Sequence, residues 1–303
     1  MRTKASVPTR ICLLGLGEVG TILADDLARP GTALSAWDLK LDDEASPPSR
    51  AAAARPLRTG RDAADAVRDS ELVISAVTAA ETVAAARAAA PALAPGAFYL
   101  DLNSASPAAK IEAAALVVER GGRYVEAAVM SAISPLRVAS PILLGGPAAQ
   151  AFQPVARGLG FTGAAYFSAE YGQAAAAKLC RSVVVKGLEA LLLESLLAAR
   201  HYGVERTVLA SLDGLAGPAD WSELAKYMLS RAVQHGGRRA EEMQAAAGMV
   251  GDAGLTPLMS AACAARQEWA GGFAVLQHER DLEALLDAIR ERMGADRKEP
   301  ARR

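Results

Sequence analysis

The apolar positions of this chain change their period once. As far as about residue 167, short apolar runs of strand length alternate with segments of helical period, and Pro and Gly residues separate them. Strands are predicted at 10–14, 33–37, 71–77, 97–102, 124–129, 142–144 and 161–167, with a short one near 56–58 inside a loop over 42–60. Helices are predicted at 19–28, 62–68, 80–90, 106–119 and 148–157. This alternation predicts a doubly wound α/β fold, with a mostly parallel sheet covered by helices on both faces.

The pattern changes after Ser168. Residues 172–201 contain no proline and one internal glycine, which predicts a single helix about 45 Å long at 1.5 Å per residue. Apolar residues cover nearly its whole circumference, so we expect it to be buried between domains or subunits. Further helices are predicted beyond it, joined by turns at 214–218, 236–237 and 251–254. The sequence therefore predicts an α/β domain over residues 1–168 and an all-helical domain over residues 169–303.

Composition excludes several classes of protein. The chain has 303 residues, enough for about two domains, and its net charge of −1 is unlike that of a nucleic-acid-binding protein. We find no apolar run of about 18 residues that is free of charge, so no transmembrane helix is expected. The polar first ten residues do not resemble a secretory signal. We therefore expect a cytoplasmic protein that contacts neither nucleic acid nor membrane.

The cysteines and histidines predict neither a disulfide nor a metal site. Cys12, Cys180 and Cys263 lie far apart in the chain, and the first two fall in a predicted strand and a predicted helix. Buried, reduced thiols are the expected state in a reducing compartment. With three histidines and no cluster at metal-ligand spacing, no bound metal is expected.

The first predicted strand runs directly into a G-x-G-x-x-G motif made of Gly15, Gly17 and Gly20. Such a motif between a strand and a helix is typical of a dinucleotide-binding unit: the first glycine permits a tight turn, the second lets the backbone approach a pyrophosphate, and the third permits close helix packing. Asp38 ends the next strand, 18 positions after Gly20. A carboxylate there accepts hydrogen bonds from the adenine ribose and repels a 2′-phosphate, so NAD is expected in preference to NADP. Residues expected at the cofactor are Gly15, Gly17, Glu18, Val19, Gly20, Asp38, Ala76 and Val77.

The long apolar helix carries one polar stripe, which contains Lys178, Ser182, Lys186 and Glu189. Residues four apart share a helix face, so Lys178 and Ser182 lie on one face. Burial lowers the pKa of a lysine, and a lysine near neutrality can exchange a proton with a substrate hydroxyl. The alternatives are a core ion pair with Glu189 or an amine that reaches out to solvent.

The arrangement resembles the family of β-hydroxyacid dehydrogenases and 6-phosphogluconate dehydrogenase. Those enzymes join a Rossmann domain to a helical domain through one long helix, which carries a catalytic lysine soon after a glycine and usually an asparagine four residues later. Here Gly172 precedes Lys178, which takes the catalytic position, and Ser182 stands in place of the asparagine. The run HGGRRAEEM at 235–243 resembles a less characterised, phosphogluconate-dehydrogenase-like branch of the superfamily.

Two further segments carry the resemblance. The segment DLNSASP at 101–107 resembles the substrate-binding segment of the family, which implies that Ser104 donates to substrate and that Asn103 lies beside the nicotinamide. The segment EAAVMSAI at 126–133 resembles the next one, with Ser131 matched. Ala132 and Ile133 replace the paired glycines that bind a carboxylate in the family. The resemblance therefore does not imply that 6-phosphogluconate is the substrate.

The resemblance implies a mechanism. Ser104, Ser131 and Ser182 would position a small hydroxy acid, and neutral Lys178 would take its hydroxyl proton as hydride passes to the nicotinamide, with decarboxylation where a carboxylate lies β to the new ketone. It also implies a homodimer through the helical domain.

Alternatives exist for the function and for the run at 235–243. One alternative is an imine reductase, although those enzymes usually place Asp or Tyr where Lys178 stands. Another is a protein that binds NAD without turnover. For the run at 235–243, the alternatives are the charged start of a surface helix or an anion-binding fork formed by Arg238 or Arg239, with the role of His235 undetermined.

Overall fold

The computed structural model describes residues 7–212, 220–252, 254–279 and 281–296. The chain divides into two compact units, Met1–Leu179 and Cys180–Arg303, which we describe one at a time. The division falls inside one helix, α8 (Gln173–Tyr202). The domain boundary predicted near residue 168 lies at the end of the last strand, before this division.

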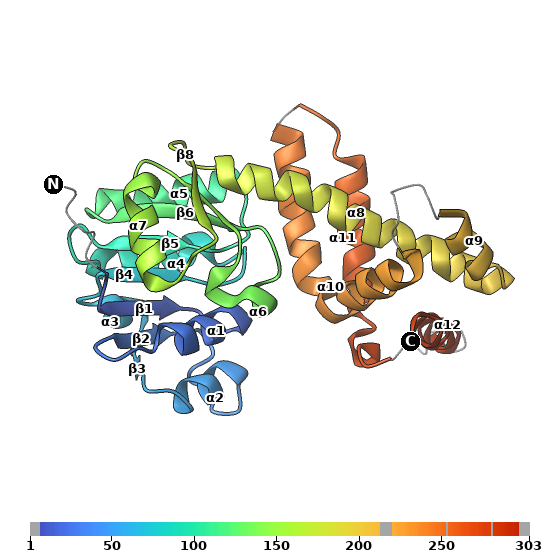
Figure 1. Ribbon diagram of the computed structural model, residues 1–303, viewed down its shortest axis with the longest axis horizontal. Coiled ribbons are helices and arrows are strands. Elements are labelled where there is room, and N and C mark those ends of the chain that lie inside the picture. Colours follow the sequence, from blue (N-terminus) through green and yellow to red (C-terminus); the bar gives the residue numbers. More distant parts are fainter. Residues whose placement is uncertain (1–6, 213–219, 253, 280, 297–303) are drawn as a thin grey trace, which may run out of the picture. The chain divides into compact units, whose positions relative to one another are not determined.

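An eight-stranded sheet forms the centre of the first unit, with the strand order β3-β2-β1-β4-β5-β6-β7-β8 (Figure 1). Its strands are β1 (Arg10–Leu14), β2 (Ala33–Trp37), β3 (Arg58–Thr59), β4 (Leu72–Ser75), β5 (Phe98–Asp101), β6 (Arg123–Val129), β7 (Ile142–Gly145) and β8 (Ala164–Ser168). All neighbours pair in parallel except β6 and β7, which are antiparallel. The first six strands therefore have the doubly wound order in which ligands bind where the strand order reverses, between β1 and β4.

Alternate residues of the strands enter two separate cores. From β1, Ile11 and Leu13 pack with α1 and α7, whereas Cys12 and Leu14 pack on the other face with α3, α4 and α5. A sheet buried on both faces explains why these strands are nearly continuous apolar runs. The helices of the unit are α1 (Glu18–Leu27), α2 (Pro47–Ala53), α3 (Ala63–Val67), α4 (Thr82–Ala89), α5 (Pro107–Glu119), α6 (Ile133–Leu136) and α7 (Ala149–Leu159), with short 3₁₀ turns at Ala90–Ala92 and Arg137–Ala139.

The helix α2 lies in the segment 42–60, which was predicted to be a loop. The segment 42–60 contains α2, whose N-cap Ser46 accepts the N–H of Ser49 at 3.2 Å and is followed by Pro47 in the first helical position. A capping serine followed by proline is a helix start, and the prediction was wrong because it weighted the Asp-, Pro- and Ser-rich composition above that local signal.

Helices make up the second unit. Beyond the part of α8 that belongs to it, they are α9 (Glu205–Leu212), α10 (Trp221–Asp252), α11 (Leu258–Gly271) and α12 (Leu282–Asp296), with a 3₁₀ turn at Ala274–Leu276. Leu193, Leu196, Leu229, Leu286 and Ile289 are among the residues that form its apolar core. The predicted turn at 214–218 lies outside the described residues.

The predicted turn at 236–237 is not a turn. Gly236 and Gly237 lie inside α10, directly after a kink at His235, where φ is −124° and ψ is 15°. A Cβ at Gly236 would overlap the backbone of α11 at Gln267 and Gly271. Gly236 therefore permits close approach of two helices, a role that sequence alone does not distinguish from a turn.

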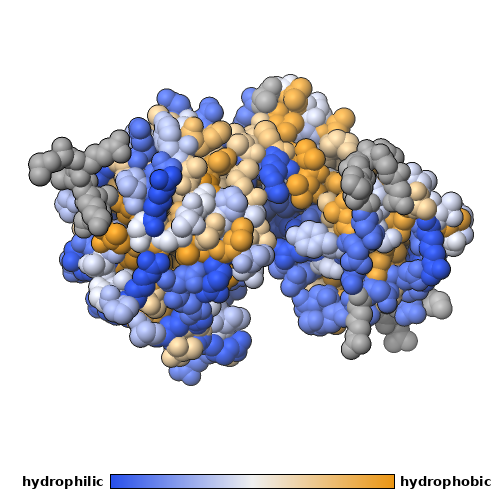
Figure 2. Space-filling model, in the orientation of Figure 1, coloured by the Kyte–Doolittle hydropathy of each residue, from blue (hydrophilic) through white to orange (hydrophobic). Residues whose placement is uncertain are grey.

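Apolar side chains are also exposed on this unit. Figure 2 shows hydrophobic surface among its helices, and on α8 the exposed fractions of Val184 and Leu191 are 69% and 56%. Cys180 is exposed, contrary to the expectation of three buried thiols, whereas Cys12 and Cys263 are buried. Within the described ranges, no helix has both the length and the apolar character needed to cross a membrane.

Candidate active site

Parallel strands bring the predicted site segments to one edge of the sheet. The strands β1, β4, β5 and β6 run in the same direction, so the loops that follow Leu14, Ser75, Asp101 and Val129 all leave from their carboxyl ends. The glycine motif and the segments that begin at Ala76, Leu102 and Met130 therefore share this edge, where doubly wound sheets bind their ligands.

The three motif glycines are required for three different reasons. Gly15 has φ +93°, and a Cβ there would lie 2.5 Å from the carbonyl oxygen of Ala76, in the loop after β4. A Cβ on Gly20 would overlap the carbonyl oxygen of Gly15, so this glycine lets α1 approach the end of β1. No protein atom lies within 4 Å of a Cβ built on Gly17. Protein packing does not explain Gly17, whereas close approach of a pyrophosphate does.

The N-terminus of α1 is suited to an anion. Gly17 is its N-cap residue and has no side chain with which to cap the helix. Glu18 and Val19 begin the first turn, whose N–H groups and positive dipole end attract phosphate. The residues present therefore fit the pyrophosphate of a dinucleotide.

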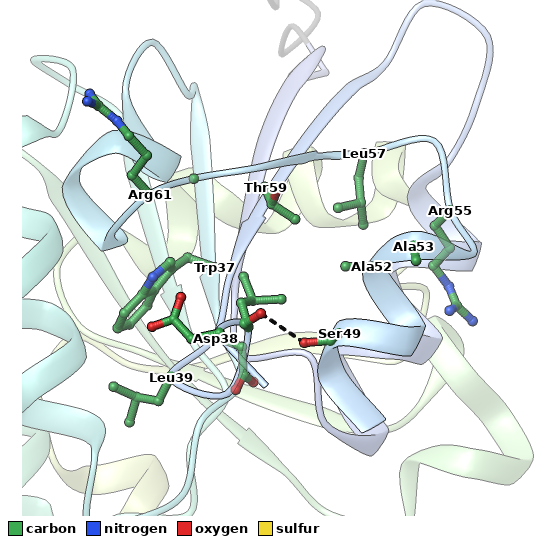
Figure 3. A pocket seen from close by; sticks show the side chains of 13 residues that line it. Trp37, Asp38, Leu39, Ser49, Ala52, Ala53, Arg55, Leu57, Thr59 and Arg61 are labelled. Carbon is green, nitrogen blue, oxygen red and sulfur yellow. Dashed lines mark hydrogen bonds between the residues drawn. The ribbon is translucent and has the colours of Figure 1, made fainter. Parts of the chain in front are cut away.

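Asp38 forms the edge of a cavity of about 600 Å³. Its carboxylate accepts the N–H of Leu16 at 2.8 Å and that of Lys40 at 3.0 Å, so it ties the glycine turn to the end of β2. Figure 3 shows the cavity walls, which come from Trp37 and Asp38, from Ser49 and Ala52 of α2, and from Thr59 and Arg61 at the end of β3. Since each carboxylate oxygen accepts more than one hydrogen bond, the turn contacts leave Asp38 able to accept from a ribose.

The Asn103 side chain links the loop after β5 to the end of β4. Its side-chain oxygen accepts the N–H of Val77 at 2.7 Å, and its amide donates to the Ser75 hydroxyl at 3.0 Å. The N–H of Ala76 donates to Leu14. The Asn103 side chain, which the resemblance places beside the nicotinamide, thus shapes the loops around that position.

A buried polar cluster lies beneath the loop that carries Asn103 and Ser104. Asp101, at the end of β5, accepts from Lys110 Nζ at 2.7 Å, from the Tyr124 hydroxyl at 2.5 Å and from the N–H of Asn103 at 2.9 Å. Both charged side chains are about 1% exposed. Burial and the neighbouring carboxylate raise the pKa of Tyr124 well above its ordinary value, so its hydroxyl remains a donor.

The structure brings together two predicted residues that are 74 positions apart. Lys178 Nζ, in the second turn of α8, donates to Ser104 Oγ at 2.5 Å, and both side chains are partly buried. The start of α8 is held by Glu126, which accepts the N–H groups of Gly172 and Ala175 at 2.5 Å each. Burial raises the pKa of Glu126, and those two N–H groups oppose the shift.

The other two predicted serines make other hydrogen bonds. Ser131 follows β6 at the same sheet edge, is exposed, and donates to the carbonyl oxygen of Ala132 at 3.1 Å. Ser182 belongs to the second unit, where its buried hydroxyl accepts from Lys186 Nζ at 3.3 Å.

Buried ion pairs join α8, α10 and α11 in the second unit. Lys186 pairs with Glu242 at 2.8 Å, and Arg239 pairs closely with Glu189, which also accepts from Gln267 at 3.0 Å. Burial lowers the pKa of Lys186, and Glu242 opposes this shift. One alternative for Lys178 was a core ion pair with Glu189, but Glu189 forms an ion pair with Arg239.

The run at 235–243 is neither the start of a surface helix nor an open fork. It lies inside α10 and begins at the kink, with Arg239 and Glu242 buried. Arg238 is half exposed and pairs with Glu242 at 3.3 Å. Helix packing buries this run because Gly236 lets α10 lie close against α11.

Asp101, Lys110 and Glu126 were not among the predicted site residues, although Asp101 and Glu126 begin the two segments that resemble the family. An acidic residue within each of two otherwise apolar predicted strands was the available signal. In the described part of the chain, no group of three or more His, Cys, Asp or Glu side chains is placed to hold a metal.

Comparison with known proteins agrees with this geometry. Residues 10–170 match the NAD-binding domain of 6-phosphogluconate dehydrogenase, which is more than half of the chain. The chain belongs to the β-hydroxyacid dehydrogenase superfamily. Its Rossmann-like sheet and helical second unit agree with the predicted fold class, and the superfamily assignment is confirmed. Residues 199–270 match a domain of unknown function.

Three solved structures are similar. A conserved hypothetical protein from Sinorhizobium meliloti 1021 is 32% identical, with 95% of this chain and 98% of that chain covered and a TM-score of 0.71. The 3-hydroxyisobutyrate dehydrogenase of Mycobacterium tuberculosis, solved with L-serine, is 20% identical, with 93% and 99% covered and a TM-score of 0.69. An imine reductase from Myxococcus stipitatus, solved with NADP+, is 17% identical, with 92% and 99% covered and a TM-score of 0.55. The last two share the fold. No curated protein gives a significant match.

Proposed function

We propose that this protein is a dehydrogenase that oxidises a hydroxyl group of a small hydroxy acid, with Lys178 as acid/base. The observation that carries the proposal is the 2.5 Å contact between Lys178 Nζ and Ser104 Oγ, at the sheet edge that also holds the glycine motif. An amine and a hydroxyl this close can share one substrate oxygen between them. That arrangement suits proton transfer from an alcohol.

Each residue has a defined task in this proposal. Ser104 donates to the substrate hydroxyl and orients it toward Lys178. Neutral Lys178 accepts the hydroxyl proton, and in the reductive direction its ammonium returns it. Ser131 and Ser182 are proposed to bind the remainder of the substrate. When bound, the nicotinamide supplies the hydride acceptor. Where a carboxylate lies β to the new ketone, the ammonium of Lys178 also favours its loss by stabilising the developing enolate.

NAD is the proposed cofactor, with NADP as second choice. Asp38 stands at the end of β2 and at the wall of the cavity, where its carboxylate repels a 2′-phosphate. Lys40 is the nearby group that would favour NADP, but it lies two residues further into the loop and is exposed.

Lys178 also separates the proposal from its alternatives. Imine reduction usually relies on Asp or Tyr at this position, so a lysine favours oxidation of an alcohol. A protein that binds NAD without turnover has no need of an amine held against a serine hydroxyl. Turnover of any substrate would exclude that second alternative.

We also propose that two copies associate through the helical unit. The exposed apolar side chains of α8, Val184 and Leu191, support this, because a monomer that leaves such side chains in water gives up their burial energy. Light scattering at micromolar concentration should give about twice the chain mass of 31.4 kDa. A stable mass of one chain would contradict the proposal.

The function is tested by a screen of small hydroxy acids that follows NADH formation, with wild-type protein and Lys178→Met in parallel. Loss of a general base costs about 10²–10⁴-fold in kcat. We expect the variant to bind NAD as the wild type does and to turn over at that reduced rate. A near-wild-type kcat for the variant would show that Lys178 is not the acid/base. Faster turnover of cyclic imines than of any hydroxy acid would favour the imine reductase.

A further inference from the structure

The helix that carries Lys178 begins without a cap of its own. Gly172 directly precedes α8, and its carbonyl oxygen accepts the N–H of Ala176 at 2.9 Å, which makes it the N-cap residue. An N-cap Ser, Thr, Asp or Asn would use its side-chain oxygen to accept the N–H two or three residues later. Gly172 has no side chain, and its φ of +87° disfavours any residue that has one.

A carboxylate from the sheet takes the place of the missing cap. Glu126 Oε1 accepts the N–H of Ala175, which is the third helical residue, and Oε2 accepts the N–H of Gly172. Glu126 is fully buried in β6. Gly145, its register partner on β7, leaves room for it, since a Cβ there would lie 3.0 Å from Glu126 Oε2.

The residue beside Glu126 on the neighbouring strand holds the loop of Ser104, the other partner in the contact with Lys178. Asp101 on β5 is the register partner of Glu126 on β6. Asp101 holds the loop of Ser104 through the N–H of Asn103, and Glu126 holds the helix of Lys178. Two in-register carboxylates thus set the positions of the two side chains that meet at 2.5 Å.

A comparison with α1 shows what is particular to α8. Both helices follow a glycine N-cap, Gly17 and Gly172. At Gly17 the space is open, which suits a phosphate, whereas at Gly172 a carboxylate of the protein already occupies the helix end. The start of α8 is therefore built to be held in place by the sheet.

We propose that Glu126 is a positioning residue, which caps α8 from the neighbouring sheet and thereby holds Lys178 against Ser104. The role assigned to Lys178 rests on the proposed function, but the cap itself does not. Glu126 acts through the helix backbone and needs no contact with substrate.

The cap is tested first, without any turnover. Glu126→Gln keeps the size of the side chain but leaves one carbonyl oxygen to serve two N–H groups. Glu126→Asp keeps the charge but is one methylene too short to reach both. We expect backbone hydrogen exchange in a peptide that spans 172–178 to be at least about tenfold faster in both variants, since an N–H that loses its acceptor loses its protection.

The matched control is Glu112→Gln, which makes the same substitution in the same unit at an exposed side chain paired with Arg87. It should leave exchange at 172–178 unchanged. Unchanged exchange in both Glu126 variants would overturn the cap, whatever the protein is found to catalyse.

Turnover then tests the positioning role. A displacement of about 1 Å at a reacting group costs roughly 10²-fold in rate, so kcat should fall by about that factor in Glu126→Gln. The dissociation constant for NAD and the KM for NAD should remain within about twofold, because the glycine motif is untouched. Faster exchange with an unchanged kcat would show that α8 is capped by Glu126 but that Lys178 does not depend on it. If Glu126→Gln does not fold, Glu126→Asp carries the same two measurements.

Discussion

Both units bury charged side chains, but they use them differently. In the N-terminal unit, Asp101 and Glu126 hold backbone N–H groups of the loop and the helix that present Ser104 and Lys178. In the C-terminal unit, Glu189 and Glu242 hold side chains of other helices, chiefly Arg239 and Lys186. The first arrangement orders the segments of the proposed site, whereas the second joins helices.

The difference follows from the two architectures. A parallel sheet brings the carboxyl ends of its strands to one edge, so a carboxylate at or near such an end lies close to the loops that bind ligands. Helices present only side chains along their length, so their buried charges must find partners on neighbouring helices. We therefore expect substitution of a buried charge in the first unit to lower kcat at the proposed active site. In the second unit, we expect such a substitution to lower only the free energy of unfolding.

The largest predicted effect compares two buried ion pairs. Lys110→Met leaves Asp101 without its cation, and Arg239→Met leaves Glu189 without its own. Removing one partner of a buried pair costs about 3–5 kcal/mol, because a charge stays buried without compensation. Urea denaturation should show this loss in both variants, and kcat should fall strongly only in Lys110→Met.

An exposed pair provides the control. Arg87→Met breaks the Arg87–Glu112 pair, whose side chains are 61% and 56% exposed, and should cost less than about 1 kcal/mol. The comparison between units fails if Arg239→Met lowers kcat as much as Lys110→Met does.

Next in size are two glycine substitutions within one motif. Gly20→Ala forces a Cβ against the carbonyl oxygen of Gly15 and should lower the free energy of unfolding by about 1–3 kcal/mol. Gly17→Ala meets no protein atom, so its unfolding free energy should change by less than about 1 kcal/mol. Its affinity for NAD should nevertheless fall at least about tenfold, equivalent to 1.4 kcal/mol. Calorimetry would measure both, and unchanged NAD binding in Gly17→Ala would place the pyrophosphate elsewhere.

A smaller effect is expected at the ribose position. Asp38→Ala removes the acceptor for the ribose hydroxyls and the contacts to Leu16 and Lys40. Because a hydrogen bond to a charged group contributes about 1.5–3 kcal/mol, NAD should bind roughly tenfold more weakly or worse. The preference of kcat/KM for NAD over NADP should also fall. A wild-type kcat/KM that is higher with NADP than with NAD would contradict the cofactor proposal.

The smallest effect is one of thiol reactivity. Burial raises the pKa of Cys12 to about 12 and that of Cys263 to about 11, so both remain protonated and shielded at pH 8. Cys180 is exposed and should react alone with iodoacetamide in the native protein. Peptide mass spectrometry would locate the label. Labelling of Cys263 at the rate of Cys180 would show that the helical unit opens readily.

Strand ends and local motifs made much of the first unit predictable. The strands 10–14 and 33–37 are found as predicted, and backbone packing explains Gly15 and Gly20 of the motif. The resemblance predicted Ser104 and Lys178 from two different segments. Only the structure shows that the two side chains are in contact. The α2 helix was missed because composition outweighed its Ser-Pro start.

The sequence by itself determined the strand–helix alternation, the glycine turn and the lysine helix, because each depends on residues close together in the chain. Only the tertiary structure decided that Glu126 caps α8, that Arg239 rather than a neighbouring lysine pairs with Glu189, and that Gly236 packs two helices together. These contacts join residues about 30 to 50 positions apart. Periodicity shows which face of an element is buried, but the packing of whole elements determines which groups meet there.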